Sequence, residues 1–543
     1  MEDMDSQINS LMSKFTVIDN YIGECEYKLA ISTLKDLLQS TVNTSVKDPL
    51  CYLDLYYIAC YLIDCGGDAG DVESIDLADS ILSGEHHEKI IDVVGKELMF
   101  YSQANALSLK LGYENAGKAN FNNIEPRIRL KKLHWKSYCA NKVDVELPRL
   151  QTLVNLAIEL KTQFRFTEAL EWVNQVLIFS EYIPEAYIAR SEIIKDLSFA
   201  SNHLSERMLL DIKDGYQRAL NIPNIREGLK SVAENGLDWT LNQLEEFDDA
   251  DSTSEDADKH QTEHEFSQLS DYRKFCIFSN LTLSEHALYC QCAGSSKDDL
   301  TVCATIGLYG DRVIPMEFVV NRIKSEFSFA RNLYFECVTL QDKPKLAEEL
   351  FLLELGNNEY LGLEAEKLRT IYRLCFGILD KIAVAISNFF EIPKITTGKK
   401  KRAVKVDFLN VWNLDLDNRR EFFNEFKNPG LVALYSISSD LNDRKQGEWD
   451  SLKAVRNALE HNFLVIREGE SDIDSYGIYD YFAEDIKIID EQEFISGLKI
   501  LLSLTRSAIF SFTYAVRYQL TYGEDYSGSK VYPLLNYLHQ KET

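Results

Sequence analysis

Apolar residues recur every three or four positions along most of the chain, which is the spacing expected of amphipathic helices. In "TLVNLAIELKTQFRFTEALEWVNQVL" (residues 152–177) the apolar positions fall into two successive groups: Leu153, Leu156, Ala157 and Leu160, then Phe166, Ala169, Leu170, Val173, Val176 and Leu177. Alternating patterns typical of strands are nearly absent, and Gly (25) and Pro (10) are scarce among the 543 residues. The sequence therefore predicts an all-α protein.

The two helices predicted in residues 152–177 form a unit that recurs. A small residue in the first helix and an aromatic–x–x–Ala pattern in the second allow two antiparallel helices to approach closely. The second-helix pattern returns in residues 27–38 ("YKLAISTLKDLL") and, more weakly, in residues 215–220 ("GYQRAL"). The unit resembles the tetratricopeptide (TPR) repeat, although its spacing is irregular and the closing proline comes late, at Pro184. The resemblance implies a TPR-like helical-repeat solenoid over residues 1–243 that binds a protein partner. A non-repetitive helical bundle is the alternative.

A sharp change of composition follows these repeats. Residues 244–266 ("LEEFDDADSTSEDADKHQTEHEF") are dense in Asp, Glu and Ser and contain almost no aliphatic side chains. Such a segment cannot bury enough apolar surface to offset the entropy lost on ordering. It is predicted to be an acidic flexible linker, and an anionic docking segment is the alternative.

Residues 267–543 form the second predicted domain, which is again helical. Its main apolar segments are residues 317–336, 364–390 and about 491–518. In the first of these the apolar positions include Phe318, Ile323, Phe327 and Leu333. The second is apolar nearly all round in its latter half and should lie at the centre of a bundle. The third is interrupted by Arg506 and is interpreted as a buried helix, not a membrane span.

The net charge of −28 repels polyanions at long range, so a general nucleic-acid coat is excluded. Any RNA contact must come from a local basic patch. "KITTGKKKRAVK" (residues 394–405) is such a patch, and its candidate phosphate-binding residues are Lys399, Lys400, Lys401, Arg402 and Lys405. A solvated basic loop without a ligand is the alternative.

The eleven cysteines have no paired spacings, which favours free thiols in a reducing compartment. One local cluster, "HALYCQC", contains His286, Cys290 and Cys292, but its C-x-C has no partner knuckle, so structural cysteines and no metal or other cofactor are expected. The acidic start "MEDMDSQINS" lacks the basic and apolar order of a secretory signal. A cytoplasmic protein without a membrane partner is therefore expected.

Candidate chemistry lies in "AVRNALEHNF" (residues 454–463). On a helix, Asn457 and His461 are four residues apart and share one face, so the amide can orient the imidazole. His461 would transfer protons near neutral pH, and Arg456 would meet the charge that develops on a phosphorane. This trio suits cleavage of a phosphodiester by its own 2′-hydroxyl without a metal ion. The alternative is a surface ion pair between Arg456 and Glu460, with no chemistry.

The spacing alone is weak because the chain contains a second copy of it. "RLKKLH" (residues 129–134) also sets an Arg five residues before a His. There Leu130 follows the Arg, so no polar group orients the His, and the segment lies among the N-terminal repeats. The context therefore favours the C-terminal motif.

The C-terminal motif and the order of helices over about residues 364–518 resemble the HEPN superfamily, in which R-N-x-x-x-H stands at the start of a late helix. From Tyr272 onward the chain looks like a HEPN family found behind TPR-like repeats in bacteria. The resemblance implies a metal-independent endoribonuclease that leaves 2′,3′-cyclic phosphate, acts as a homodimer with a shared cleft, and belongs to antiphage or toxin-type defence. Arg456 and His461 match its catalytic residues and Asn457 its polar residue.

Two features stay open at this stage. Asp380 and Lys381 in the long central helix are candidates to approach the cleft, or they form a helix-surface ion pair. A non-catalytic TPR/HEPN adaptor or scaffold is the alternative function, and the sequence does not distinguish tRNA, rRNA or mRNA as the target.

Overall fold

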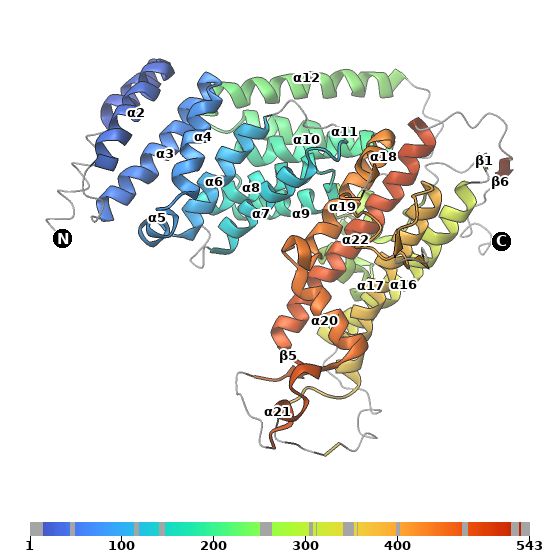
Figure 1. Ribbon diagram of the computed structural model, residues 1–543. Helices are drawn as coiled ribbons and strands as arrows, with labels where there is room; N and C mark the ends of the chain where they lie inside the picture. The colour runs from blue at the N-terminus through green and yellow to red at the C-terminus, as the bar shows by residue number, and fades with distance from the viewer. Residues whose placement is uncertain are drawn as a thin grey trace. The chain divides into compact units, whose positions relative to one another are not determined.

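The computed structural model describes residues 15–43, 49–112, 119–140, 147–249, 263–302, 308–310, 312–339, 352–353, 355, 357–397, 402–416, 418–469, 476–522 and 531–533. Its described parts are mostly helical, with many paired helices in the N-terminal region (Figure 1). The predicted all-α class is therefore confirmed. Small two-stranded sheets, which the sequence pattern did not indicate, join some of the C-terminal helices.

Contacts between residues divide the chain into two compact units. The first comprises Met1–Gly117 and Glu125–Glu159, and the second comprises Lys118–Ile124 and Leu160–Thr543. This division does not coincide with the predicted acidic boundary, because the helices that follow Leu160 pack with the C-terminal region.

The predicted linker over residues 244–266 is helical at both of its ends. Its first residues end α12 (Glu227–Asp249), and its last residues lie in α13 (Glu263–Ser267). Residues 250–262 lie outside the described residues. The flexible acidic linker therefore stays a prediction for that central part.

The first unit is built from successive packed helices. They are α2 (Tyr27–Asn43), α3 (Pro49–Ala69), α4 (Val72–Ser83), α5 (His87–Val94), α6 (Lys96–Leu111), α7 (Ile124–Ala140) and most of α8 (Leu147–Thr162). Helix α3 contacts both α2 and α4. Ala30, Ile31 and Leu34 of the predicted repeat are buried in this core. The pattern of residues 27–38 therefore marks a helix packed on its neighbour.

A buried histidine lies in α7. His134 is 3% exposed, and its Nδ1 has no hydrogen-bond partner within the described part of the chain. Burial lowers the pKa of His134 to about 4. The imidazole is therefore neutral in the folded protein, and charging it opposes folding.

We predict that the first unit loses stability as the pH falls from about 7 toward about 4. The unfolded chain takes up a proton near pH 6.5 and the folded chain does not, so His134 contributes stability above the unfolded pKa. About 3 kcal/mol is lost on acidification. His134→Leu should flatten this pH dependence, measured as amide hydrogen exchange of α7 after correction for intrinsic rates. His264→Leu, at an exposed position, should keep the wild-type profile; equal profiles in both variants would contradict the assignment.

The second unit contains the remaining elements. Its helices before the small sheets are α9 (Phe166–Phe179), α10 (Pro184–Ser201), α11 (Glu206–Leu220), α12, α13, α14 (Asp271–Phe278), α15 (His286–Tyr289) and the 3₁₀ helix η1 (Ala293–Ser296). They are followed by β1 (Leu308–Gly310), α16 (Val313–Thr339), α17 (Leu363–Phe389), β2 (Thr396–Thr397), β3 (Arg402–Ala403), α18 (Arg419–Phe426), α19 (Pro429–Asp440) and η3 (Asp443–Lys445). The last are α20 (Asp450–His461), β4 (Phe463–Arg467), α21 (Ile478–Phe482), η4 (Ala483–Asp485), β5 (Ile486–Asp490), α22 (Glu491–Tyr522) and β6 (Val531–Pro533).

Strand pairing is local in two cases and distant in one. β2 pairs antiparallel with β3, β4 pairs parallel with β5, and β1 pairs antiparallel with β6 near the end of the chain. Helices α16 and α17 lie side by side (Figure 1). Of the apolar positions named in α16, Ile323, Phe327 and Leu333 are buried, whereas Phe318 is 72% exposed and lies off the buried face.

Helix α22 is the core helix of this unit. It contacts α9, α16, α17 and α19. Within the described part of the chain, α22 is the helix long and apolar enough to span a membrane. However, 67% of its most apolar 18-residue stretch is buried inside the protein. Arg506 and Arg517 are buried in it and form ion pairs with Glu171 and Glu285. This packing agrees with its interpretation as a buried helix.

At Gly430, helix α19 comes close to the backbone of α22. A Cβ atom added to Gly430 would lie 2.5 Å from the carbonyl oxygen of Ser511 and 2.5 Å from the backbone nitrogen of Ala515. Both atoms belong to the backbone of α22 and cannot rotate away. Gly430 is therefore required by the close approach of the two helices.

Gly430→Ala should destabilise the second unit by about 3 kcal/mol, because the new methyl group forces the two helices apart. The matched control is Gly377→Ala in α17, where the added Cβ would meet only Lys381 Nζ, at an ordinary 3.6 Å. That substitution should gain about 0.5–1 kcal/mol from helix propensity. Thermal unfolding of both variants measures the difference, and similar midpoints would contradict the backbone contact.

Candidate active site

The R-N-x-x-x-H motif lies in the second half of α20. The helix buries Leu452, Val455, Ala458 and Leu459. Their spacing defines one apolar face, so the residues between them point toward solvent. The helix ends at His461 because Asn462 takes an extended conformation and leads directly into β4. The motif therefore stands at the end of its helix and not at the start, where the family resemblance placed it.

Arg456 is half-buried and interacts with Asp380 of α17. Its Nη2 lies 3.6 Å from Oδ2 of Asp380, and its guanidinium carbon lies 5.9 Å from the ring centre of Phe376. Glu460 forms its ion pair with Arg373, at 3.2 Å between Oε1 and Nε. The alternative in which Glu460 occupies Arg456 is therefore wrong for this structure.

Asp380 is held in place on two sides. Its Oδ1 accepts a hydrogen bond from the backbone N–H of Phe408 at 3.1 Å, while Oδ2 faces Arg456. Burial raises the pKa of Asp380, and the Phe408 N–H and the charges of Arg456 and Lys405 oppose that rise. Lys381 points elsewhere and donates to Glu326. Of the two open candidates, Asp380 joins the site.

Asn457 and His461 lie on the exposed face of α20. Asn457 Oδ1 accepts a hydrogen bond of 3.5 Å from Arg456 Nη1. Among the residues that the structure describes, no hydrogen bond joins Asn457 to His461, and His461 has no hydrogen-bond or ion-pair partner. The amide thus contacts the Arg of the motif and not the imidazole that it was predicted to orient.

Arg456 and His461 of one chain point in different directions. Five residues of α-helix correspond to a rotation of about 140° and a rise of about 7.5 Å. Asn457 and His461 differ by only about 40° and share one side. The two side chains therefore leave one α20 on different sides of the helix.

A cavity of about 490 Å³ opens beside Arg456. Its wall contains four cationic side chains: Arg444, Lys445, Lys453 and Arg456. It also contains the carboxylates Asp380, Asp407 and Asp415 and the aromatic rings of Phe376, Phe408, Trp412 and Tyr435. The cations of such a wall can contact phosphate oxygens. The four rings are buried, with Trp412 1% exposed and Phe408 and Tyr435 each 2% exposed, so they form the floor of the cavity and not a stacking surface.

Three of these cations, Arg444, Lys445 and Lys453, were not among the candidates named from the sequence. Lys453 precedes Arg456 by three residues, so helical spacing alone places them on one side of α20. That signal was available in the sequence. Arg444 and Lys445 lie in η3, between α19 and α20. Their position at the cavity depends on how this connection folds, which no local sequence pattern predicts.

The predicted basic loop is described only in part. Lys399, Lys400 and Lys401 lie outside the described residues, and Arg402 begins β3. Lys405 is exposed and close enough for its charge to act on Asp380. Lys405 is therefore the residue of this loop that the structure brings near the motif.

The second R-x-x-x-x-H sequence is excluded by burial. Arg129 is exposed, whereas His134 lies inside the core of the first unit. Its Arg and His therefore do not face a common solvent-filled space.

His286, Cys290 and Cys292 lie close together in the second unit. Within the described part of the chain, these three residues form the group that could hold a metal ion.

Part of the second unit matches a known protein family. Residues 309–519 match the family model described as LA2681-like HEPN, and the match includes α16, α17, α19, α20 and most of α22. No significant match was found among curated proteins or among solved structures. The match begins at residue 309, before the predicted core at about residue 364, and ends at residue 519, next to the predicted end at about residue 518. The chain therefore carries an LA2681-like HEPN domain at residues 309–519, preceded by a helical N-terminal region.

Proposed function

We propose that the HEPN domain is a metal-independent endoribonuclease in which Arg456 and His461 are the catalytic residues. HEPN domains are commonly ribonucleases. The observation that carries the proposal is the position of the R-N-x-x-x-H motif. The motif lies inside the matched range, and Arg456 lies in the wall of a cavity that also contains Arg444, Lys445 and Lys453.

The exposed groups of the motif fit cleavage by the 2′-hydroxyl of RNA. His461 takes the proton of this hydroxyl or gives one to the departing 5′-oxygen. Arg456 binds the non-bridging oxygens of the phosphorane through its planar guanidinium. The products are a 2′,3′-cyclic phosphate and a 5′-hydroxyl. Asp380 is the positioning residue, because it holds one edge of Arg456 and leaves the other donors for phosphate.

Arg456 and His461 lie on different sides of one α20, and a site shared between two copies would bring them together. The Arg of one copy would then meet the His of its partner across a shared cleft. Exposed aromatic rings next to His461 support this arrangement: Phe463 is 58% exposed and Tyr481 is 83% exposed, and both contact Phe482. An apolar surface of this kind, beside a motif of charged and polar residues, suits contact with a second copy.

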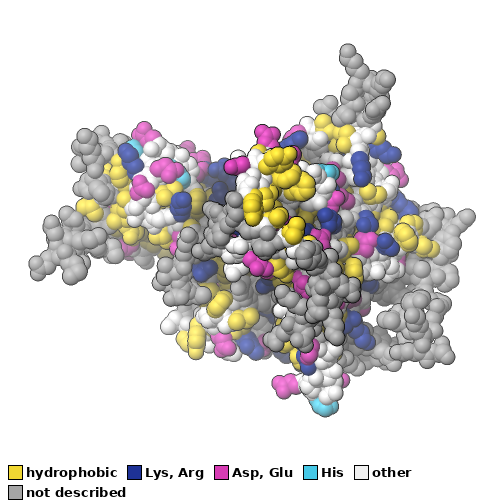
Figure 2. Space-filling view, turned by 90° about the horizontal axis from the view of Figure 1, so that it is seen from below, with side chains coloured by type: hydrophobic (Ala, Val, Ile, Leu, Met, Phe, Trp, Pro, Cys, Tyr) yellow, Lys and Arg dark blue, Asp and Glu magenta, His cyan; other side chains and the backbone are white. Residues whose placement is uncertain are grey.

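The surface charge limits where RNA binds. On the face drawn in Figure 2, basic and acidic side chains of the described residues are mixed, and hydrophobic side chains gather in small groups. With a net charge of −28, attraction to RNA is local. The cavity beside Arg456, together with the predicted loop Lys399–Lys405, is the proposed contact for phosphates flanking the cleaved bond.

The helical N-terminal region is the proposed docking site for a protein partner or activator, and a cytoplasmic role in antiphage or toxin-type defence follows from the family resemblance. A non-catalytic adaptor is the second candidate. The observation that favours it is the ion pair with Asp380, which already engages the half-buried Arg456.

Wild-type protein should cleave tRNA or total RNA in the presence of EDTA, because no step of the proposed reaction uses a metal ion. His461→Ala and Arg456→Ala should each reduce the rate by about 100-fold or more. The control is Arg129→Ala, in the second R-x-x-x-x-H sequence, which should cleave as the wild type does. Cleavage that persists equally in the two motif variants would leave the adaptor as the function.

Mixing the two inactive variants tests the composite site. A mixed dimer of Arg456→Ala and His461→Ala chains holds one site with both catalytic residues and one with neither. After exchange of subunits, half of the dimers are mixed, so about a quarter of the wild-type activity should return. Cleavage rate and native mass are measured together. Absence of any recovery in a verified mixed dimer would contradict a site shared between copies.

A further inference from the structure

The segment between α14 and α16 is buried although it has little regular structure. Over residues 279–302 it contains only the four-residue helix α15 and the short 3₁₀ helix η1. Leu283 and Ser295 within it are nevertheless fully buried. A buried irregular segment requires side-chain ties, because few of its backbone groups can pair within a helix or sheet.

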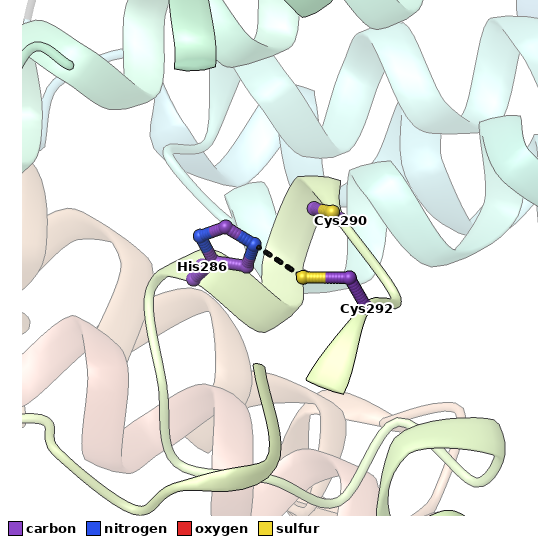
Figure 3. A group of neighbouring side chains, drawn as sticks. All are labelled: His286, Cys290 and Cys292. Atoms are coloured by element: carbon purple, nitrogen blue, oxygen red, sulfur yellow. Dashed lines mark hydrogen bonds between the residues drawn. The ribbon is translucent and has the colours of Figure 1, made fainter. Parts of the chain in front are cut away.

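Three side chains with strong metal-binding atoms meet at the centre of this segment. His286 begins α15, and Cys290 and Cys292 follow its end in extended backbone. All three are 5–6% exposed, and their ligand atoms lie within 4.8 Å of one another. The Nε2 atom of His286 lies 3.2 Å from Sγ of Cys292 (Figure 3).

These separations suit one tetrahedral ion. Zinc binds sulfur at about 2.3 Å and nitrogen at about 2.0–2.1 Å, so two ligand atoms of one tetrahedral site lie about 3.5–3.8 Å apart. The ligand atoms of His286, Cys290 and Cys292 therefore need only small rotations to surround an ion. A mixed sulfur and nitrogen set selects zinc over magnesium or calcium, which prefer oxygen.

Two arginines lie close to this group. Arg207 lies close enough to act electrostatically on Cys290 and Cys292, and its Nε is a buried donor without a partner in the described part of the chain. Arg190 donates to the backbone oxygen of Tyr289 at 2.8 Å. Asp211, which forms an ion pair with Arg207, offsets one of these positive charges. An outer layer of this kind orients ligands and stabilises negative sulfur.

We propose that His286, Cys290 and Cys292 bind one zinc ion, with a water molecule in the fourth position. Two thiol protons leave when the ion binds, so two thiolates, one neutral imidazole and one Zn²⁺ form a group without net charge. Such a group is suited to burial. The ion fixes the irregular segment next to α9, which α15 contacts. The proposed site is separate from the R-N-x-x-x-H motif.

Metal analysis of the full-length, tag-free protein tests the proposal. Zinc, copper and iron are measured in one preparation grown with added zinc, and about one zinc per chain is expected. Cys290→Ser, Cys292→Ser and His286→Gln should each lower the zinc content. Cys276→Ser is the matched control, because Cys276 is a fully buried thiol of α14 outside the group and should keep the ion. Arg456→Ala should also keep it, so this proposal and the nuclease fail independently.

Cobalt exchange on the wild-type chain covers the case in which a variant does not fold. Co²⁺ in the site should give thiolate-to-cobalt charge-transfer absorption, which added zinc should then remove. A folded wild-type protein that holds less than about a tenth of a zinc per chain after reconstitution and shows no such absorption would overturn the proposal. Copper or iron in place of zinc would overturn it as well. The group would then be one of hydrogen-bonded side chains only.

Discussion

The buried positive charge of Arg165 is the constraint on which the second unit depends. A guanidinium removed from water is tolerated only when oxygen atoms surround it, and loss of one partner of such a pair typically costs about 3–5 kcal/mol. Glu168 of α9 supplies two of these oxygens. Ser436 and Asp440 of α19 supply others, and Ser507 of α22 donates to Glu168 in turn. One charge therefore joins three helices from distant parts of the chain, and α9 and α10 both contact α22.

Asp440, which pairs with Arg165, also contacts the residue before α20. Asp440 is the last residue of α19, and its backbone oxygen accepts a hydrogen bond of 2.8 Å from the N–H of Trp449. The chain between them closes so tightly that a Cβ on Gly447 would lie 2.1 Å from that oxygen. Helix α20 starts at the next residue after Trp449. The position of Arg456 is thus linked, through α19, to a buried charge in the helical region before the domain.

Helices and their buried faces were largely predictable, because they depend on neighbours three and four residues apart. The central helix expected at residues 364–390 is observed at Leu363–Phe389, and Val173 and Val176 are buried as their spacing predicted. Features that depend on distant partners were not predictable. The pairing of Arg165 with Asp440 joins residues 275 positions apart, and no local pattern marks it.

In the candidate site, too, local features were predictable and contacts with distant residues were not. The motif itself was readable, and the second R-x-x-x-x-H sequence was rejected by local reasoning that the burial of His134 supports. Of the partners of the motif, Asp380 was an open candidate in the sequence, whereas Arg373, which pairs with Glu460 from another helix, was not predicted. The end of α20 at His461 also escaped prediction, since it depends on the parallel pairing of β4 with β5.

The contact at Gly430 has a mechanical consequence. At Gly430 no side chain separates the two backbones, so this point of contact between α19 and α22 resists sliding. Because Arg165 also joins α9 to α19, a force applied to α9 by the proposed partner would be transmitted to the helices of the HEPN domain. In the proposed dimer, such a signal would change the spacing and angle between the two copies, and the geometry inside each copy would stay the same.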